Sequence, residues 1–252
     1  MESRVESNTA IFLDFLSKRK QKATFFVLGW IAEKHPFLIK KISEAGHEIG
    51  YHSYFHALPV KQGANAFEQD LVRGLGLLED ITGKKINFYR APMFSLCKES
   101  AWTIPILLKH GITISSSYKA YKPFNIHTIP HLPFLFENNG RYLLELPLNR
   151  QKMLGMKIVY SGSGYIRLLP IWIIEYLFGR HSYNMSYFHP RDFDTQVPAT
   201  PLLPSYRNFM SRYGNAGALL KLDSLLQKLP FISIGEAGER LKMDTLQVVR
   251  VE

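Results

Sequence analysis

The chain has 252 residues, of which 46% are hydrophobic and 21% are charged, a composition that is ordinary for a globular protein. This length is sufficient for one large α/β domain with a full hydrophobic core. The single cysteine, Cys97, excludes an internal disulfide, and no apolar run approaches the roughly 20 residues that a membrane span needs. The formal net charge of +10 predicts attraction to nucleic acid, anionic lipid headgroups or anionic polysaccharide.

The lysines and arginines are scattered along the chain, as in residues 18–22 and at Lys40 and Lys41. No glycine/aromatic RNA-binding signature and no zinc-finger spacing accompanies them. We therefore interpret the positive charge as solvated surface, and we expect no nucleic-acid partner.

The first half of the chain alternates between helical and strand-like patterns. Residues 8–20 place apolar side chains at helical spacing, and residues 23–28 form a continuous apolar run that ends at Gly29, which is typical of a buried parallel strand. The same reasoning predicts helices at 36–46, 65–82 and 100–110, and strands at 47–51, 86–90 and 112–114.

The second half gives a weaker signal. Its patterns predict strands at 142–146 and 185–188, and helices at 166–178 and 216–228. Strand–helix units of about 25 residues are the mark of a parallel sheet or barrel, and no linker rich in Pro, Gly or Ser divides the chain. We therefore predict a single α/β domain over residues 1–252.

Three polar residues follow predicted strands. His52, Arg90 and His189 stand at or just after the ends of such runs, where parallel α/β folds gather their chemistry. His52 and His56 are four residues apart, so both imidazoles can close on one metal ion, and the glycine that ends the strand-like run before them lets the backbone bend. Two histidines are one ligand short of a catalytic zinc site, which normally has three protein ligands and an open position.

Four segments together resemble the polysaccharide deacetylases, which share the chitooligosaccharide (NodB-like) deacetylase domain. Residues 23–29 look like a core strand of that family, and residues 52–56 match its metal motif, H-S/T-x-x-H. Residues 88–92 match its R-x-P groove motif, and residues 187–190 match the late strand that ends in its catalytic histidine. The resemblance implies an irregular (β/α)7-type barrel.

The resemblance also implies a metal-dependent hydrolase that acts on carbon–nitrogen, non-peptide bonds and removes N-acetyl groups from N-acetylated sugars of a cell-surface polysaccharide or its precursor. A divalent metal, usually zinc, would be held by His52, His56 and an aspartate. The histidine that matches His189 would protonate the leaving amine, because imidazole ordinarily titrates near neutrality. Arg90 would fix the carboxylate of the general base, and Pro92 and Tyr89 would form part of the substrate groove.

The sequence departs from the family pattern at two places. The family carries its base and its metal aspartate in a motif some tens of residues before the strand that matches 23–28, whereas only 22 residues precede Ala23 here. Asp14 falls at a surface position of its helix, so we expect the first strand, the aspartate base and the aspartate metal ligand upstream of residue 1. Relatives also commonly carry an aspartate near Ser115 that supports the catalytic histidine. Asp192 or Asp194 would have to replace it.

Two explanations of the missing carboxylates compete. The chain starts at an internal methionine, or it is a catalytically impaired homologue that acts as a saccharide-binding or assembly protein. Residues 164–170, 189–194 and 220–226 resemble a subgroup found with exopolysaccharide and O-antigen biosynthesis. The expected partners are an N-acetylated oligo- or polysaccharide and, peripherally, the polysaccharide assembly machinery. Because residues 1–8 lack the apolar core of a signal peptide, we expect a cytoplasmic protein or one peripheral to the membrane.

Overall fold

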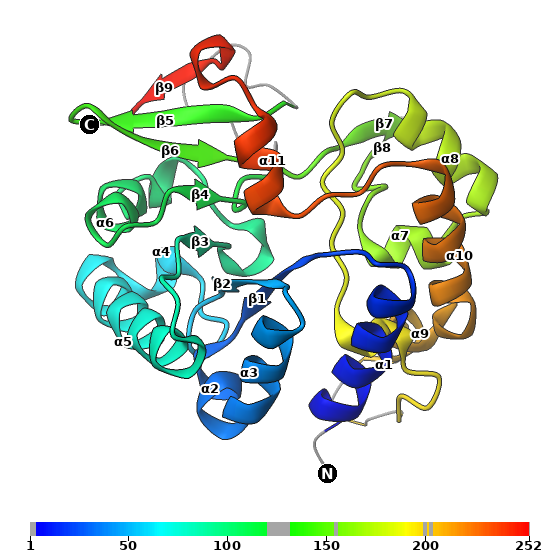
Figure 1. Cartoon of the computed structure of the whole chain (residues 1–252). Coiled ribbons are helices and arrows are strands. Elements are labelled where there is room, and N and C mark those ends of the chain that lie inside the picture. Colours follow the sequence, from blue (N-terminus) through cyan, green and yellow to red (C-terminus); the bar gives the residue numbers. More distant parts are fainter. Residues whose placement is uncertain (1–3, 120–131, 154–155, 199–200, 202–203, 252) are drawn as a thin grey trace. The chain divides into compact units, whose positions relative to one another are not determined.

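The computed structural model describes residues 4–119, 132–153, 156–198, 201 and 204–251 (Figure 1). The chain divides into two compact units. The first, which we call the helical unit, contains residues 1–21 and 149–231, and the second, the sheet unit, contains residues 22–148 and 232–252. One domain can contain two compact units, so the single domain over residues 1–252 stays a prediction.

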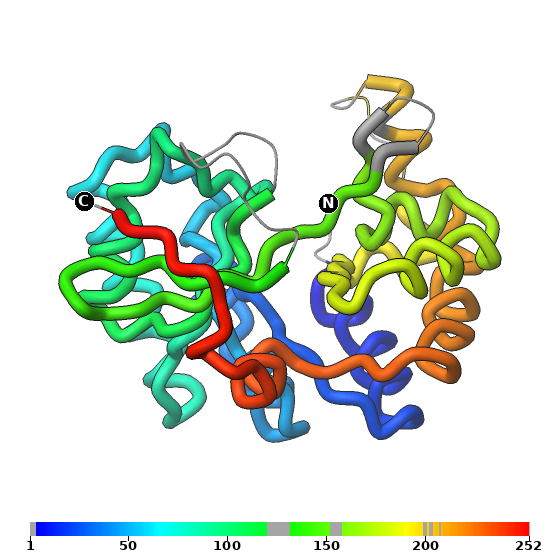
Figure 2. The backbone as a smooth tube through the Cα atoms, turned by 90° about the horizontal axis from the view of Figure 1, so that it is seen from above, coloured from blue at the N-terminus to red at the C-terminus, as the bar shows by residue number. Residues whose placement is uncertain are grey.

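The sheet unit is built on a sheet in which the described strands follow the order β1-β2-β3-β4-β6-β5-β9. Strands β1, β2, β3, β4 and β6 are parallel neighbours. Strand β5 pairs antiparallel with β6, and β9 lies parallel beside β5 (Figure 2). The strands are β1 (Thr24–Val27), β2 (Glu48–Tyr51), β3 (Phe88–Tyr89), β4 (Ile114–Ser115), β5 (Phe134–Asn138), β6 (Arg141–Glu145) and β9 (Val248–Arg250). The predicted α/β class is confirmed, and the sheet is open between β1 and β9, as in an irregular barrel.

Helices connect these strands, as a parallel sheet requires. They are α2 (Gly29–Lys34), α3 (Pro36–Glu44), α4 (Pro59–Gln62), α5 (Ala64–Thr82), α6 (Thr103–Lys109) and α11 (Ile234–Arg240). The sequence did not predict α2, which begins directly at Gly29. A Cβ atom there would lie 2.4 Å from Cδ2 of Tyr54, so this glycine permits a close approach instead of ending a strand.

The sheet packs against α5 through large aromatic side chains. Tyr51, Phe67 and Tyr89 are fully buried, and the ring centroids of Phe67 and Tyr89 are 5.8 Å apart. Gly74 of α5 leaves room for Tyr51, because a Cβ atom at this position would lie 2.0 Å from the Tyr51 ring. The contact brings α5 close to the end of β2.

The helical unit contains α1 (Val5–Lys18), the hairpin β7 (Gln151–Met153) and β8 (Met156–Ile158), α7 (Ser163–Leu168), α8 (Ile171–Gly179), the 3-10 turn η3 (Pro190–Phe193), α9 (Ser205–Arg212) and α10 (Asn215–Lys228). One core cluster joins Tyr160, Ile166, Ile174 and Leu225, and a second packs Phe193 against Ala218 and Leu222. Asp14 is exposed on α1 and pairs with Lys18 at 2.6 Å, which confirms its predicted surface position.

Two predicted elements of this unit are wrong. The helix predicted over 166–178 is split into α7 and α8, because Pro170 cannot continue a helix and directly precedes α8. The strand predicted over 185–188 is reduced to one bridge between Tyr187 and Gly162. Side chains replace the ladder there, since the N–H of Met185 donates to Oδ1 of Asn149 at 2.6 Å.

Within the described residues, no helix combines the length and the apolar character needed to cross a membrane.

Candidate functional site: two histidines at a strand end and a third on a buried ion pair

The candidate site of the sheet unit lies where neighbouring parallel strands end. Tyr51 of β2 is in register with Tyr89 of β3, Tyr89 with Ser115 of β4, and Ser115 with Glu145 of β6. These four residues form one row across the sheet, which we call the strand-end row. Figure 1 shows the strands β2, β3, β4 and β6 that carry it. His52 follows the row on β2 and Arg90 follows it on β3, so the structure brings both to the same edge of the sheet.

His52 and His56 lie together, with ring centroids 5.1 Å apart. Nδ1 of His52 is 2.7 Å from the backbone oxygen of Arg90. Because a carbonyl oxygen can only accept, Nδ1 carries the hydrogen and Nε2 carries the lone pair that can bind a metal. A backbone acceptor on the other ring nitrogen is the usual support of a metal-binding histidine.

The loop that carries both histidines is bent sharply and held by its surroundings. Ser53 has φ 67° and His56 has φ 59°, the left-handed region that non-glycine residues rarely adopt. The Ser53 hydroxyl accepts the N–H of Ala57 at 2.9 Å. Asp70 of α5 accepts the N–H of Tyr54 at 3.0 Å and the hydroxyl of Tyr51 at 2.7 Å. Asp70 is thus a supporting residue that sequence reasoning missed, since it stands 14 residues after His56 inside an amphipathic helix.

Arg90 is half-buried at the end of β3. Its Nε donates to the backbone oxygen of Ser116 at 3.1 Å, and its Nη2 donates to the Ser116 hydroxyl at 3.0 Å. Its guanidinium also lies over the rings of Phe26 and Phe94, 4.2 Å and 4.8 Å from their centroids. These contacts fix the planar group, and its role toward a base carboxylate stays a prediction.

Glu145 is a fully buried carboxyl group in the strand-end row. Its Oε1 accepts the N–H groups of Ser117 and Tyr118, both at 2.7 Å. Burial raises the pKa of Glu145, against the opposing effects of the Ser115 hydroxyl, these two N–H groups and the charge of Arg90.

The two predicted groove residues are both buried. Tyr89 is 2% exposed, and its ring packs against Tyr51 and Phe67, so it serves the core and offers no face to a sugar ring. This corrects the prediction for Tyr89. Pro92 begins a 3-10 turn (Pro92–Phe94) with its ring buried. The exposed side chain of that turn is Met93.

The third histidine, His189, belongs to the helical unit and immediately precedes η3. Its side chain is 51% exposed. Oδ2 of Asp192 accepts the N–H of His189 at 2.7 Å and lies 3.2 Å from Nδ1. Burial alone would raise the pKa of Asp192, but the His189 imidazole, the Ser163 hydroxyl and the His189 N–H outweigh it and lower that pKa to about 2. The ionised carboxylate keeps the hydrogen on Nδ1 and leaves Nε2 as the reactive nitrogen.

Asp192 is held in turn by Arg167 of α7, which is also buried. Nη2 of Arg167 is 3.3 Å from Oδ1 of Asp192. Sequence reasoning missed Arg167, because no spacing links residues 167 and 192. Asp194, the other candidate support for His189, instead pairs with Arg4 at 2.7 Å and 2.8 Å. The structure therefore selects Asp192.

The donor set of the sheet unit fits part of a divalent metal site. His52 and His56 present two imidazoles, one of them with its hydrogen fixed on the non-binding nitrogen. Among the residues that the structure describes, no group of three or more His, Cys, Asp or Glu side chains could hold an ion. The two histidines thus fit two ligand positions of such a site.

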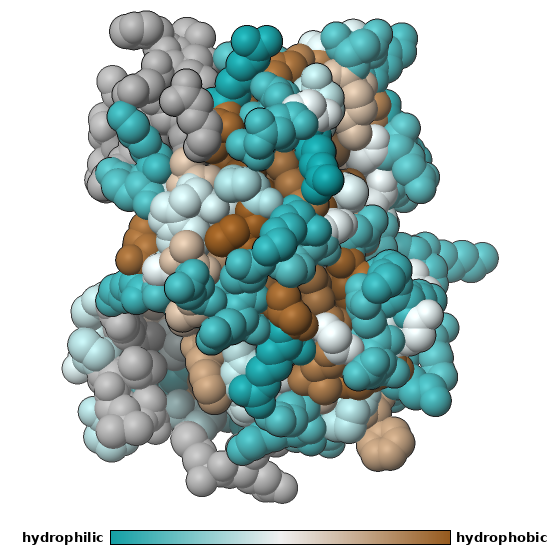
Figure 3. All heavy atoms as spheres, turned by 90° about the vertical axis from the view of Figure 1, so that its left-hand side faces the viewer, coloured by the Kyte–Doolittle hydropathy of each residue, from teal (hydrophilic) through white to brown (hydrophobic). Residues whose placement is uncertain are grey.

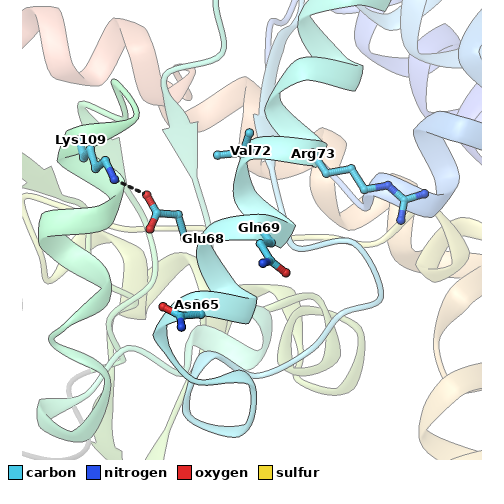
Figure 4. Close-up of a pocket in the computed structure, with 6 residues that line it drawn as sticks. All are labelled: Asn65, Glu68, Gln69, Val72, Arg73 and Lys109. Atoms are coloured by element: carbon cyan, nitrogen blue, oxygen red, sulfur yellow. Dashed lines mark hydrogen bonds and ion pairs between the residues drawn. The ribbon is translucent and has the colours of Figure 1, made fainter.

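A hollow on the surface of α5 and α6 is separate from these residues. It is lined by Asn65, Glu68, Gln69, Val72, Arg73 and Lys109 (Figure 4). Glu68 already pairs with Lys109 at 2.8 Å and with His110 at 2.6 Å. The guanidinium of Arg73 lies over the Tyr54 ring, 4.0 Å from its centroid. The charged residues of the hollow thus already interact within the protein, and we do not assign the hollow a function.

Two family models match the chain in succession. Residues 2–114 match the model described as polysaccharide deacetylase. Residues 115–238 match a domain of unknown function, DUF3473. The boundary falls at Ser115 in the strand-end row, so the second model covers Glu145, Arg167, Asp192 and His189.

Curated relatives match a shorter part of the chain. A peptidoglycan deacetylase of Helicobacter pylori is 35% identical over 105 residues, which are 42% of this chain and 35% of that protein. A peptidoglycan-N-acetylglucosamine deacetylase of Bacillus cereus is 36% identical over 84 residues, 33% of this chain and 30% of that protein. The chain thus matches about a third of the length of these relatives.

Solved structures are similar over almost the whole chain. A candidate polysaccharide deacetylase from Mycobacterium smegmatis has a TM-score of 0.68 at 22% identity, over 97% of this chain and 80% of that chain. A CE4 family pseudoenzyme from Bacillus anthracis has a TM-score of 0.55 at 15% identity, over 98% of this chain and 66% of that chain. At these identities the similarity shows the fold.

Proposed function

We propose that the chain is a hydrolase that cleaves the amide bond of N-acetylated sugars and releases acetate, because residues 2–114 match the polysaccharide deacetylase model. The relatives that act on peptidoglycan support a cell-surface glycan or its precursor as the substrate class. The observation that carries the proposal is the His52–His56 pair, in which the Arg90 carbonyl fixes the hydrogen of His52 on the nitrogen that does not bind metal. We propose zinc as the ion and an exopolysaccharide-type polymer as the substrate.

Each residue then has a defined task. His52 and His56 would hold the ion through one ring nitrogen each, and Asp70 keeps their loop in its bent conformation. A bound divalent ion supplies Lewis acidity to the acetamide carbonyl and to water. Arg90, fixed by Ser116 and two aromatic rings, would orient the carboxylate that takes the proton of the attacking water.

His189 would complete the reaction. With Nδ1–H directed at Asp192, the protonated imidazole would donate the hydrogen on Nε2 to the nitrogen of the leaving amine. The sugar then leaves as the free amine and the acyl group as acetate. The Asp192 carboxylate, whose pKa is lowered to about 2, holds the ring in the orientation that this step needs.

A second candidate function is saccharide binding without hydrolysis. It is favoured by the two-histidine donor set of the described residues. The similarity to a CE4 family pseudoenzyme shows that the fold also occurs in a protein described in that way. On this reading, His52 and His56 remain as polar residues at a sugar-binding edge.

One experiment separates the two functions. Metal content would be measured by plasma mass spectrometry on this chain and on any longer product of the same reading frame, together with acetate release from an N-acetylglucosamine oligomer. If the protein is a deacetylase, we expect about one ion per chain. The ion should be lost in His52→Ala and His56→Ala, and it should be kept in His189→Ala and in the control His110→Ala. Acetate release should also disappear in His189→Ala. Metal uptake unchanged in the first two variants would refute the ligand assignment, and sugar binding without acetate release would favour the second function.

A further inference from the structure

Helix α9 (Ser205–Arg212) exposes the face that an amphipathic helix normally buries. Tyr206, Phe209, Met210 and Tyr213 follow one another at the spacing i, i+3, i+4, i+7, which places them on one side of the helix. Their exposed fractions are 63%, 55%, 41% and 43%. The rings of Phe209 and Tyr213 are 5.0 Å apart. We call this surface the α9 face.

Helix α9 is attached to the protein at its carboxyl-terminal end. Arg167 donates to the backbone oxygens of Tyr213 at 2.9 Å and Met210 at 3.2 Å. Asn215 donates to the backbone oxygen of Ser211 at 3.2 Å. The helix is thus fixed through its carboxyl-terminal carbonyls, and the exposed fractions of the α9 face show that this face is open to solvent.

The charged residues of the α9 segment all have one sign. Residues 204–213 contain two arginines and no acidic residue. The helical unit as a whole carries 14 Lys and Arg against 7 Asp and Glu, whereas the sheet unit carries 17 against 14. Most of the net charge of +10 therefore belongs to the unit that contains α9, and Asp192 and Asp194 of that unit are already paired with arginines.

We propose that α9 lies on an anionic phospholipid surface, with the α9 face among the headgroups and first acyl carbons. A short helix with aromatic and methionine side chains on one side and arginine beside them is the pattern of an interfacial helix. Tyrosine suits that depth because its ring is apolar and its hydroxyl is polar. Anionic lipids add attraction for each nearby cation. The attachment needs no membrane-spanning segment, and it would bring the protein to a surface where lipid-linked or envelope glycans are held.

The test is co-sedimentation of the intact chain with vesicles of phosphatidylcholine alone and with vesicles that also contain phosphatidylglycerol. Binding to the anionic vesicles is expected, and it should weaken as the salt concentration rises. The double variant Phe209→Glu/Met210→Glu should bind at least tenfold more weakly, because it removes two apolar anchors and adds negative charge. Arg212→Gln should weaken binding about fivefold.

Phe37→Glu is the matched control, since Phe37 is 85% exposed on α3 of the sheet unit and lies outside the α9 face. It should leave vesicle binding unchanged, and circular dichroism should show that every variant is folded. Binding that does not depend on Phe209 and Met210 would overturn the proposal. If the chain does not bind vesicles but forms a dimer that the variant Phe209→Glu/Met210→Glu dissociates, the α9 face would be assigned to a second copy of the chain. Loss of glycan retention in that variant, without vesicle binding, would assign it to the substrate.

Discussion

The sheet unit and the helical unit hold their histidines in different ways. His52 follows a regular parallel strand, and its ring is oriented by a backbone carbonyl at the end of the next strand. His189 precedes a 3-10 turn, and its ring is oriented by a buried carboxylate that itself depends on a buried arginine. The support of His52 comes from the main chain, so it depends on the packing that fixes the strands. The support of His189 depends instead on the charges of Asp192 and Arg167.

This contrast predicts the largest loss of stability at Asp192. Asp192→Asn keeps the shape of the side chain but leaves the buried guanidinium of Arg167 without its counter-ion. We expect the free energy of unfolding at pH 7 to fall by about 3 kcal/mol, measured by urea denaturation. Asp14→Asn, which breaks the exposed pair with Lys18, should change it by less than about 0.5 kcal/mol. Equal effects of the two substitutions would break the comparison.

The contribution of Asp192 to stability should depend on pH. The pKa of Asp192 is lowered from 3.8 to about 2 in the folded protein, so the folded state releases this proton more readily than the unfolded state does. The stabilisation is therefore fully present above about pH 3.8 and is lost as the pH falls toward 2. Asp192→Asn should remove this part of the acid sensitivity, and the difference in stability between the two proteins should shrink over that interval.

In the sheet unit, volume should matter more than charge. Gly74→Ala places a methyl group where the Tyr51 ring stands, and overpacking of this kind costs about 1–3 kcal/mol. Gly76 is the control, because it is exposed two residues away on the same helix and a Cβ atom there meets nothing within 4 Å. Gly76→Ala should stabilise the protein slightly, by up to about 1 kcal/mol. Similar thermal midpoints for both variants would contradict the packing of α5 on Tyr51.

A smaller effect is expected at Arg90. Arg90→Lys keeps the positive charge but loses the planar group that bonds Ser116 and lies over Phe26 and Phe94. The expected loss in free energy of unfolding is about 1 kcal/mol. Arg73→Lys, at an exposed position, should have a smaller effect. A larger loss from Arg73→Lys would show that the stacking on Phe26 and Phe94 contributes little.

The smallest change at neutral pH is expected at Glu145, although this residue is as deeply buried as Asp192. Glutamine can accept the same two N–H groups, and it removes a carboxyl whose pKa burial has raised. A raised pKa means that stability falls as the pH rises above about 4.5, where the unfolded state ionises first. Glu145→Gln should therefore unfold at the same or a higher urea concentration at pH 7, with a flatter pH profile. A loss comparable to that of Asp192→Asn would show that the sheet unit also depends on a buried charge.

On the face of the molecule drawn in Figure 3, hydrophilic and apolar side chains alternate. A mixture of this kind is ordinary for the surface of a globular protein.

The sequence predicted the parts of the structure that depend on local spacing. The positions of His52 and His56 follow from a five-residue motif, and the strand before them is a continuous apolar run. The parallel order of β1 to β4 follows from the strand–helix alternation. Tyr89 was misjudged because a tyrosine at a strand end can face either solvent or core, and only the packing of Phe67 decides between them.

Contacts between residues far apart in the sequence could not be predicted. The strand expected at 185–188 has the right composition, but Asn149 takes the N–H of Met185 from 36 residues away. Arg167 and Asp192 are 25 residues apart with no shared periodicity, and Asp194 was an equally good candidate by spacing. The ion pair between Arg4 and Asp194, 190 residues apart, decides between them.

The guanidinium of Arg167 has two tasks at once, because it caps the carboxyl-terminal end of α9 and also holds the carboxylate of Asp192. It donates to the last carbonyls of α9 and pairs with the carboxylate that orients His189. Lysine has no fork with which to serve both, so even the most conservative exchange would release a helix and a proton donor together. A lineage that altered the outer surface of this unit would thus have to keep arginine at position 167. Otherwise it would lose both the support of α9 and the support of His189.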